Sequence, residues 1–176
     1  VWTVEHLAWA DRANQERRRT LAPSAGWRWL QGEAPVEGRL IGGCLEVLDW
    51  LRGTPVWPGP ERWEGAVLFL ETSEEAPSPL AVTRMLRALA ACGALDRAAA
   101  LLFGRPGGEV AVSQFDAYDY ALLRVIRDEL GRDDMPIVTR MDFGHTEPNT
   151  VLPYGVLTRV DPLSRTVALL EAGVEA

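Results

Sequence analysis

Residues 66–71 read AVLFLE, a continuous apolar run that ends in a glutamate. A short run without polar alternation is typical of a strand buried on both faces of a sheet. AAALLFG at residues 98–104 and MPIVTRM at residues 135–141 have the same character. Helical patterns separate the three runs, so together they predict parallel strands joined by right-handed helical crossovers.

The segments between these strands carry clear helix signals. Residues 78–93, SPLAVTRMLRALAACG, begin with Ser-Pro and end at glycine, which is the usual order of helix start and stop signals. Residues 113–131, SQFDAYDYALLRVIRDELG, form a longer amphipathic pattern with Ser113 as its N-cap. The sequence therefore predicts an α/β protein with a parallel βαβαβ core.

Segments on both sides extend this core. VEGRLIGG at residues 36–43 predicts a strand that ends in two glycines, and CLEVLDWLRG at residues 44–53 predicts the helix after it. YGVLTRVD and RTVALLEAG, joined by the turn DPLS, predict a C-terminal antiparallel hairpin. Residues 3–20 place apolar side chains at helical intervals and predict a helix capped by Thr3.

Length and composition narrow the class of protein. The chain has 176 residues, is 47% hydrophobic and carries a formal net charge of −7, which suits one domain and argues against nucleic acid as a partner. Because no run of about 18 apolar residues occurs, no membrane span is predicted. Cys44 and Cys92 show no disulfide framework and no metal-ligand spacing, and we expect reduced, buried thiols in a cytoplasmic protein.

Polar residues follow several of the predicted strands where the carboxyl ends of parallel strands gather ligands. Glu71 ends the first buried strand, and His145 follows the third in DFGHTEPN. Gly42-Gly43 ends the earlier strand and opens a helix, whose N–H groups point to the same rim. A carboxylate that accepts the Nδ1 proton of a histidine fixes its tautomer for proton transfer at Nε2, so Glu71 and His145 are candidates for an orienter and a base.

Ordinary interpretations of this pair stay open. A glutamate at a strand end is commonly solvated, and a loop histidine commonly caps or packs. Strands two places apart in a sheet lie about 10 Å from each other. Direct contact between Glu71 and His145 therefore requires neighbouring strands or a loop that leans the histidine inward, and the glycine before His145 permits a close backbone approach.

A nucleophile is missing from this set. None of the serines lies in a G-x-S-x-G elbow; they are Ser24, Ser73, Ser78, Ser113 and Ser164. Cys44, at the helix opening, is the internal alternative, with His145 as its base, because a helix N-terminus lowers the pKa of a thiol. No phosphate loop, zinc motif or dinucleotide fingerprint occurs.

Four segments resemble the C-terminal domain of LD-carboxypeptidases, a serine-peptidase family that includes the microcin C self-immunity carboxypeptidases. In chain order they are GRLIGGCLEVLDWLRGTP, VLFLETSEE, LAACGALDRAAALLFGRP and GHTEPNTVLPYG. The match runs from about residue 36 to about residue 172. It implies a swivelling β/β/α domain over residues 36–176, an interdomain linker segment with a helix over residues 1–35, and an N-terminal domain absent from this chain.

The resemblance also implies a Ser-Glu-His triad split between two domains. The missing N-terminal domain would carry the serine nucleophile and the oxyanion hole, and this chain would supply Glu71 and His145. Family members are hydrolases that cleave an amide bond next to a free carboxylate, in murein LD-tetrapeptides during peptidoglycan recycling or in peptidyl-nucleotide antibiotics. We therefore expect a cytoplasmic serine carboxypeptidase that needs no metal or organic cofactor, with this chain inactive alone and a homodimer left open.

Four substrate-binding residues follow from the resemblance. They are Gly43, Cys44, Glu75 and Trp2, with Trp2 expected to stack on a nucleobase. The family often has asparagine where this chain has Cys44, and the immunity branch has lysine near Glu75, so the substrate stays open between murein peptide and peptidyl-nucleotide. A non-catalytic ligand-binding or scaffold domain built on the same fold is the alternative of another class.

Overall fold

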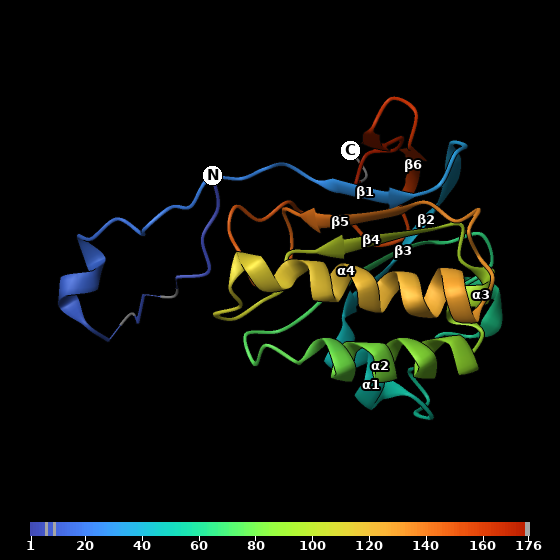
Figure 1. Ribbon diagram of the computed structural model, residues 1–176, viewed down its shortest axis with the longest axis horizontal. Coiled ribbons are helices and arrows are strands. Elements are labelled where there is room, and N and C mark those ends of the chain that lie inside the picture. The colour runs from blue at the N-terminus through green and yellow to red at the C-terminus, as the bar shows by residue number, and fades with distance from the viewer. Residues whose placement is uncertain (6, 9, 175–176) are drawn as a thin grey trace.

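A seven-stranded mixed sheet organises the protein (Figure 1), in the order β1-β5-β4-β3-β2-β6-β7. The computed structural model describes residues 1–5, 7–8 and 10–174. The strands are β1 (Arg28–Gln31), β2 (Val36–Cys44), β3 (Val67–Glu71), β4 (Ala100–Gly104), β5 (Ile137–Met141), β6 (Leu157–Asp161) and β7 (Thr166–Leu169). The helices are α1 (Leu45–Leu51), α2 (Pro79–Ala91), α3 (Ala94–Arg97) and α4 (Phe115–Leu123), which continues as a π-helix over Arg124–Glu129.

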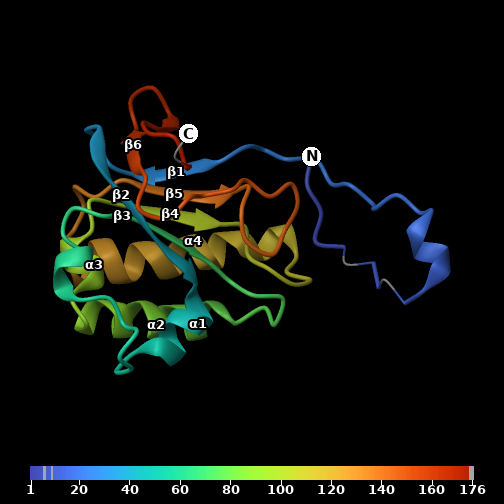
Figure 2. The same ribbon diagram turned by 180° about the vertical axis from the view of Figure 1, so that it is seen from behind.

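The four central strands, β2 to β5, are parallel and lie side by side in chain order. Because each connection moves one strand further in the same direction, α1, α2 and α4 all lie on one face of the sheet (Figures 1 and 2). The antiparallel pair β6–β7 extends the sheet beyond β2 and curls away from it. The α/β class, the parallel core and the C-terminal antiparallel hairpin are as predicted from the sequence.

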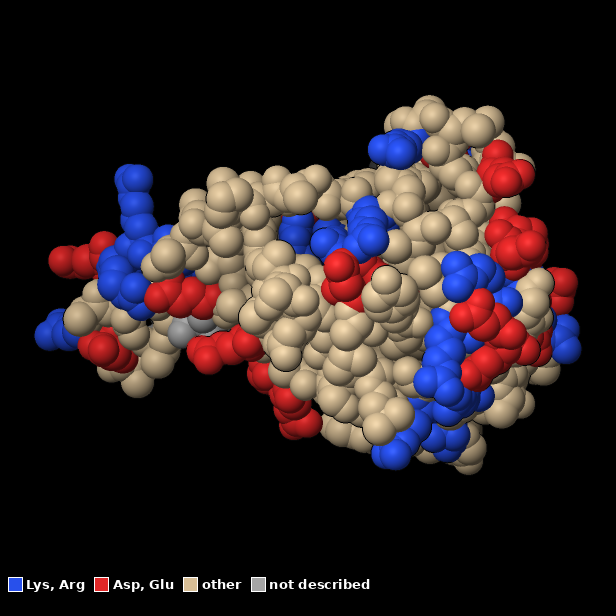
Figure 3. All heavy atoms as spheres, in the orientation of Figure 1, with Lys and Arg blue, Asp and Glu red and all other residues tan. Residues whose placement is uncertain are grey.

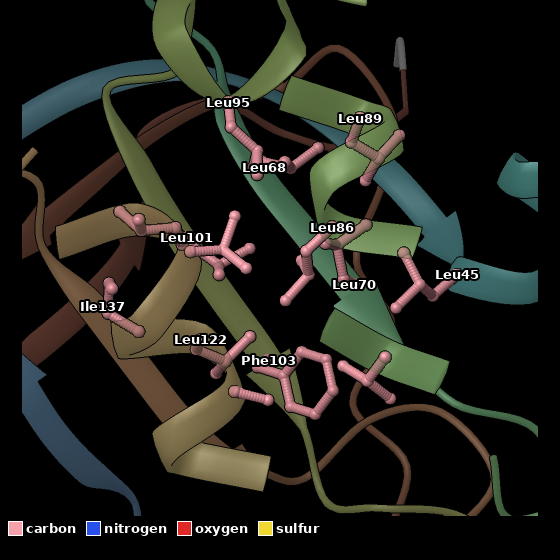
Figure 4. Packing of buried hydrophobic residues seen from close by; sticks show 14 of the residues in the cluster. Leu45, Leu68, Leu70, Leu86, Leu89, Leu95, Leu101, Phe103, Leu122 and Ile137 are labelled. Atoms are coloured by element: carbon pink, nitrogen blue, oxygen red, sulfur yellow. The ribbon is translucent and has the colours of Figure 1, made fainter. Parts of the chain in front are cut away.

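Alternation along the central strands explains why their sequences are apolar throughout. Leu68 and Leu70 of β3, with Leu101 and Phe103 of β4, pack under Leu86 of α2 in the large core (Figure 4). The residues between them on each strand face the opposite side, in a second buried cluster with β5 and β6. Each fully buried leucine contributes roughly 2 kcal/mol to folding. Packing on both faces of the sheet thus fixes the positions of β3 and β4, including the ends of these strands.

The helix predicted over residues 3–20 is wrong. In the part of this segment that the structure describes, regular structure is limited to the isolated bridges at its start and a 3-10 turn over Arg12–Gln15, capped by Asp11. Beyond Val4, the segment projects away from the sheet (Figure 1), and among its described apolar residues Ala8, Ala10 and Ala13 are exposed. A short helix gains most of its stability from packing, which these positions lack. His6 and Trp9 lie outside the described residues.

Two contacts anchor this N-terminal segment to the domain. Trp2 and Ala22 exchange two backbone hydrogen bonds of 2.9 and 2.8 Å. Thr3 and Glu147 do the same, at 2.8 and 2.9 Å. Thr3, expected as a helix cap, therefore pairs with the loop that follows β5. Both ends of the segment, at Thr3 and at Ala22, thus lie near that loop.

Strand β1 is a further difference from the sequence prediction, which contains no strand before residue 36. It pairs antiparallel with β5, with Arg28 opposite Thr139. Residues 28–31 thus belong to the same sheet as the rest of the domain, while the division of the chain at residue 35 stays a prediction. No helix in the described part of the chain is long and apolar enough to cross a membrane.

Candidate active site

Glu71 and His145 are in direct contact. Glu71 is the last residue of β3 and lies beside Cys44, the last residue of β2. The Glu71 side chain is buried, at 10% exposure, and its Oε2 lies 2.7 Å from Nδ1 of His145. The imidazole is 40% exposed at the rim where the parallel strands end. One ring nitrogen is therefore held by a buried acceptor while the other faces outward.

The contact forms although β4 lies between the strands that lead to the two residues. Gly104 ends β4, and a Cβ there would lie 2.6 Å from the carbonyl oxygen of Phe143. Gly144 has a φ of +97°, and a Cβ there would lie 2.7 Å from Cβ of Glu71. These two glycines let the loop after β5 cross the end of β4, so that His145 leans inward.

Asn149 holds the turn that carries the histidine. Its Oδ1 accepts a hydrogen bond from the backbone N–H of Gly144 at 3.2 Å, and its Nδ2 donates to the carbonyl of Gly144 at 2.8 Å. The backbone N–H of Thr150 donates to the carbonyl of Asp142 at 2.6 Å, closing the loop at its base. The Asn149 amide thus pairs with both backbone groups of Gly144, as the backbone of a neighbouring strand would. This residue was not identified from the sequence.

A buried arginine fixes the start of the same loop. Arg105, 2% exposed, forms an ion pair with Asp142, which also accepts a hydrogen bond from Nε1 of Trp27 at 2.8 Å. The guanidinium lies 5.5 Å from the ring centre of Trp2, which is 6% exposed and tilted against Phe115. The Trp2 ring is enclosed and packs beneath the arginine, and the expectation that it stacks on a nucleobase stays a prediction.

Glu46, in the first turn of α1, organises the loop after β3. It is 9% exposed, and its Oε1 accepts hydrogen bonds from the backbone N–H of Ser73 at 2.9 Å and from the Ser73 hydroxyl at 2.7 Å. The Ser73 oxygen in turn accepts from the N–H of Glu75 at 3.2 Å, as expected for a residue that starts a turn. Sequence reasoning missed Glu46, whose position just after the Gly-Gly strand end was the available signal.

The electrostatic surroundings favour a charged imidazole. Burial by itself lowers the pKa of His145, but the hydrogen bond and charge of Glu71, with the charges of Glu74 and Glu46, outweigh it and raise the pKa above its ordinary value. Oε2 of Glu74 lies 3.2 Å from Nε2 of His145. The imidazole therefore stands between two carboxylates, one buried and one exposed.

The same carboxylates disfavour a thiolate nearby. Burial, with the charges of Glu71 and Glu46, raises the pKa of Cys44 to about 11, and the backbone hydrogen bonds from α1 do not offset this. The raised pKa weighs against the alternative in which Cys44 is a nucleophile activated by a helix N-terminus, which stays a prediction. Cys92, expected to be buried, is exposed at the end of α2.

Two hollows flank His145 and Glu74, which line both of them. One, of about 370 Å³, lies toward the N-terminal segment and is bordered by Thr3, Val4, Glu5, Arg19, Gly108, Gly144, Thr146, Glu147 and Asn149. The other, of about 240 Å³, lies toward α1 and is bordered by Cys44, Glu46, Val47, Trp50, Ser73 and Glu75.

The structure separates the expected substrate-binding residues. Cys44 and Glu75 line the hollow beside α1. A Cβ at Gly43 would lie 3.5 Å from the hydroxyl of Tyr154, and Trp2 lines neither hollow.

Arginines and acidic residues are interspersed over the face of the molecule shown in Figure 3. Among the described residues, no group of three or more His, Cys, Asp or Glu side chains is arranged to hold a metal ion.

Comparison with known proteins identifies relatives of this domain. Residues 37–160 match the family described as the LD-carboxypeptidase C-terminal domain. A putative carboxypeptidase of Synechocystis is 32% identical over 85% of the chain and 47% of its own length. The microcin C7 self-immunity protein MccF of Escherichia coli is 27% identical over 97% and 46%, and a probable murein peptide carboxypeptidase of Bacillus subtilis is 30% identical over 78% and 41%.

Solved structures give the same result. The MccF-like protein of Streptococcus pneumoniae, in complex with AMP, superposes with a TM-score of 0.80 and 30% identity, covering 96% of this chain and 50% of that one. MccF in complex with glutamyl sulfamoyl guanosine gives a TM-score of 0.78 and 26% identity over 99% and 49%. The chain thus spans about half the length of the relatives it matches.

Proposed function

Since the chain belongs to the LD-carboxypeptidase C-terminal domain family, we propose that it supplies the general base and its orienting carboxylate to a serine carboxypeptidase. The observation that carries the proposal is the 2.7 Å contact between His145 and the buried carboxylate of Glu71, at a rim bordered by two hollows. Among the described residues, no serine hydroxyl is hydrogen-bonded to His145. The serine therefore belongs, in this proposal, to the part of the enzyme that the chain does not span.

The geometry assigns the roles of the two residues. Glu71 accepts the Nδ1 proton of His145, which leaves the lone pair of the neutral imidazole on Nε2, the outward nitrogen. Nε2 takes the proton of the serine hydroxyl as its oxygen attacks the substrate carbonyl, and later returns the proton to the leaving amine. Glu71 stabilises the imidazolium between these steps. Water then hydrolyses the acyl-enzyme with His145 again as base.

The substrate in this proposal is an amide next to a free carboxylate. A relative named as a murein peptide carboxypeptidase favours an LD-tetrapeptide, and structural neighbours that bind AMP and glutamyl sulfamoyl guanosine favour a peptidyl-nucleotide. Cys44 and Glu75, on the wall of the hollow beside α1, are the positions we expect to contact it. Swivelling of the domain and a cytoplasmic location stay predictions.

The test is kinetic and uses the intact protein that contains this chain. We expect His145→Ala to lower kcat/KM by roughly 10⁶-fold and Glu71→Ala by roughly 10⁴-fold, as removal of the corresponding triad members does in other serine hydrolases. Glu37→Gln is the matched control, since the Glu37 side chain is exposed on β2 and pairs with Arg159. Thermal unfolding checks that each variant is folded.

Two results would count against the proposal. Rates within a few-fold of the unsubstituted protein in both variants would remove Glu71 and His145 from the chemistry. Tight binding of the substrate with no hydrolysis by the unsubstituted protein would favour the non-catalytic ligand-binding alternative.

A further inference from the structure

Glu74 occupies the nitrogen of His145 that the proposed mechanism uses. Its Oε2 lies 3.2 Å from Nε2, on the side of the ring opposite the Glu71 contact. The Glu74 side chain is 76% exposed, whereas that of Glu71 is 10% exposed. The imidazole thus lies between a buried carboxylate, Glu71, and a solvent-exposed carboxylate, Glu74.

Hydrogen bonds hold the backbone around Glu74, whereas its side chain is exposed. Ser73 is bonded to the buried Glu46 through both its N–H and its hydroxyl. Thr72, fully buried, accepts a hydrogen bond from the N–H of Gly107 at 3.0 Å. The N–H of Ala76 donates to the carbonyl of Ser73 at 3.2 Å, which closes a tight turn with Glu74 inside it. The turn therefore presents this carboxylate to His145 from a rigid base.

We propose that Glu74 is a positioning residue, which holds Nε2 of His145 in the unliganded site and yields that place to the nucleophile. The proposal rests on the proposed function, because it assigns the nitrogen that Glu74 covers. Nε2 binds one hydrogen-bond partner at a time. Beside the Glu74 carboxylate, a charged imidazole keeps its proton on Nε2; a serine hydroxyl needs the unprotonated nitrogen as its acceptor.

When the serine hydroxyl replaces Glu74 at Nε2, every proton is accounted for. The Nε2 proton passes to bulk water, and the exposed Glu74 carboxylate turns to solvent, which solvates it at little cost. The hydroxyl of the serine then donates to the vacated lone pair. Glu74 thereby keeps His145 charged and oriented until the nucleophilic serine takes its place at Nε2.

Charged and titratable groups face the imidazole from every element around it. They are Glu71 of β3, Glu46 of α1, Cys44 between β2 and α1, Glu74 and Glu75 of the following loop, and Glu5, Arg19 and Glu147 across the larger hollow. Arg19 is paired with Glu147, and Glu5 with Arg17. Among the described groups, Glu71 and Glu74 are the two whose oxygens lie within 4 Å of the ring nitrogens, at 2.7 and 3.2 Å. Substitution of Glu74 therefore removes the carboxylate at Nε2 and leaves the one at Nδ1.

The first measurement is an NMR titration of the His145 imidazole in this chain, assigned with a His145→Gln variant. Glu75→Gln is the matched control, because it removes the same charge one residue further along without a contact to the ring. We expect Glu74→Gln to lower the pKa of His145, since the oxygen that stabilises the charged ring is lost, and Glu75→Gln to leave it nearly in place. Equal shifts in the two variants, or none in either, would overturn the proposal.

The second measurement is the pH dependence of kcat/KM in the intact protein. We expect the acidic limb, where His145 loses its proton, to move to lower pH in Glu74→Gln and to stay in place in Glu37→Gln, whose carboxylate is exposed on β2 and pairs with Arg159 away from the site. A lower plateau with an unmoved limb would overturn the proposal and make Glu74 a substrate contact. If the unsubstituted protein hydrolyses neither substrate class, the proposed function fails, and the NMR titration alone decides whether Glu74 holds Nε2.

Discussion

At the scale of single residues, the surroundings of Cys44 decide its reactivity. Its thiol is buried beside two carboxylates, and its pKa is raised to about 11. At pH 8 about one molecule in a thousand carries the thiolate that reacts with alkylating reagents. We expect iodoacetamide to modify the exposed Cys92 at least about 10-fold faster than Cys44, as followed by peptide mass spectrometry. A Cys92→Ser variant isolates the slow reaction; faster labelling of Cys44 would restore it as a candidate nucleophile.

Residues at strand ends were predictable, and residues that act through loop conformation were not. Glu71 and His145 could be found because each flanks an apolar run whose carboxyl end must lie at the rim. Asn149 and Glu74 carry no such mark, because their contacts depend on how two loops fold toward each other. The packing of Trp2 could not be predicted for a related reason: nothing near it in sequence reveals that Arg105 and Phe115 enclose its ring.

At the scale of elements, the loop after β5 depends on a glycine at its crossing point. Gly144 and Gly131 both have positive φ, +97° and +69°, but a Cβ at Gly131 meets nothing within 4 Å, whereas one at Gly144 meets Glu71 at 2.7 Å. We expect Gly131→Ala to cost about 1 kcal/mol of unfolding free energy, from backbone strain alone. Gly144→Ala should cost more and also lower the pKa of His145 toward its ordinary value.

Chemical denaturation of the two alanine variants, with the His145 titration, checks this expectation. Because both carry the same backbone penalty, the difference between them reports the displaced contact with Glu71. Indistinguishable stabilities and unchanged titration in Gly144→Ala would show that the crossing loop tolerates a side chain there, against the geometry described.

The parallel strands and their helices could be predicted because each carries a local pattern that agrees with its final packing. Strand β1 could not, since its pairing partner β5 is about a hundred residues away and its own four residues are only partly buried. The segment over residues 3–20 shows the reverse error. Helical spacing there is real, but the described alanines of the pattern, Ala8, Ala10 and Ala13, are exposed, so they contribute no packing that would stabilise a helix.

At the scale of the whole molecule, half of the proposed site lies outside this chain. We expect the purified 176-residue chain to hydrolyse neither an LD-tetrapeptide nor a peptidyl-nucleotide above the uncatalysed rate, while the intact protein does. Chromatographic detection of released amine, with His145→Ala as the background control, measures both. Turnover by the isolated chain at enzyme-like rates, abolished in that control, would mean that a nucleophile lies among the residues described.

The pair of hydrogen bonds between Thr3 and Glu147 has a mechanical consequence. Glu147 stands two positions from the imidazole, so a torque on the first residues reaches the base through backbone alone, without crossing the hydrophobic core. The backbone of Thr3 and the loop that carries the imidazole are therefore coupled directly, so that a displacement of Thr3 would move Glu147 and, with it, the turn at His145.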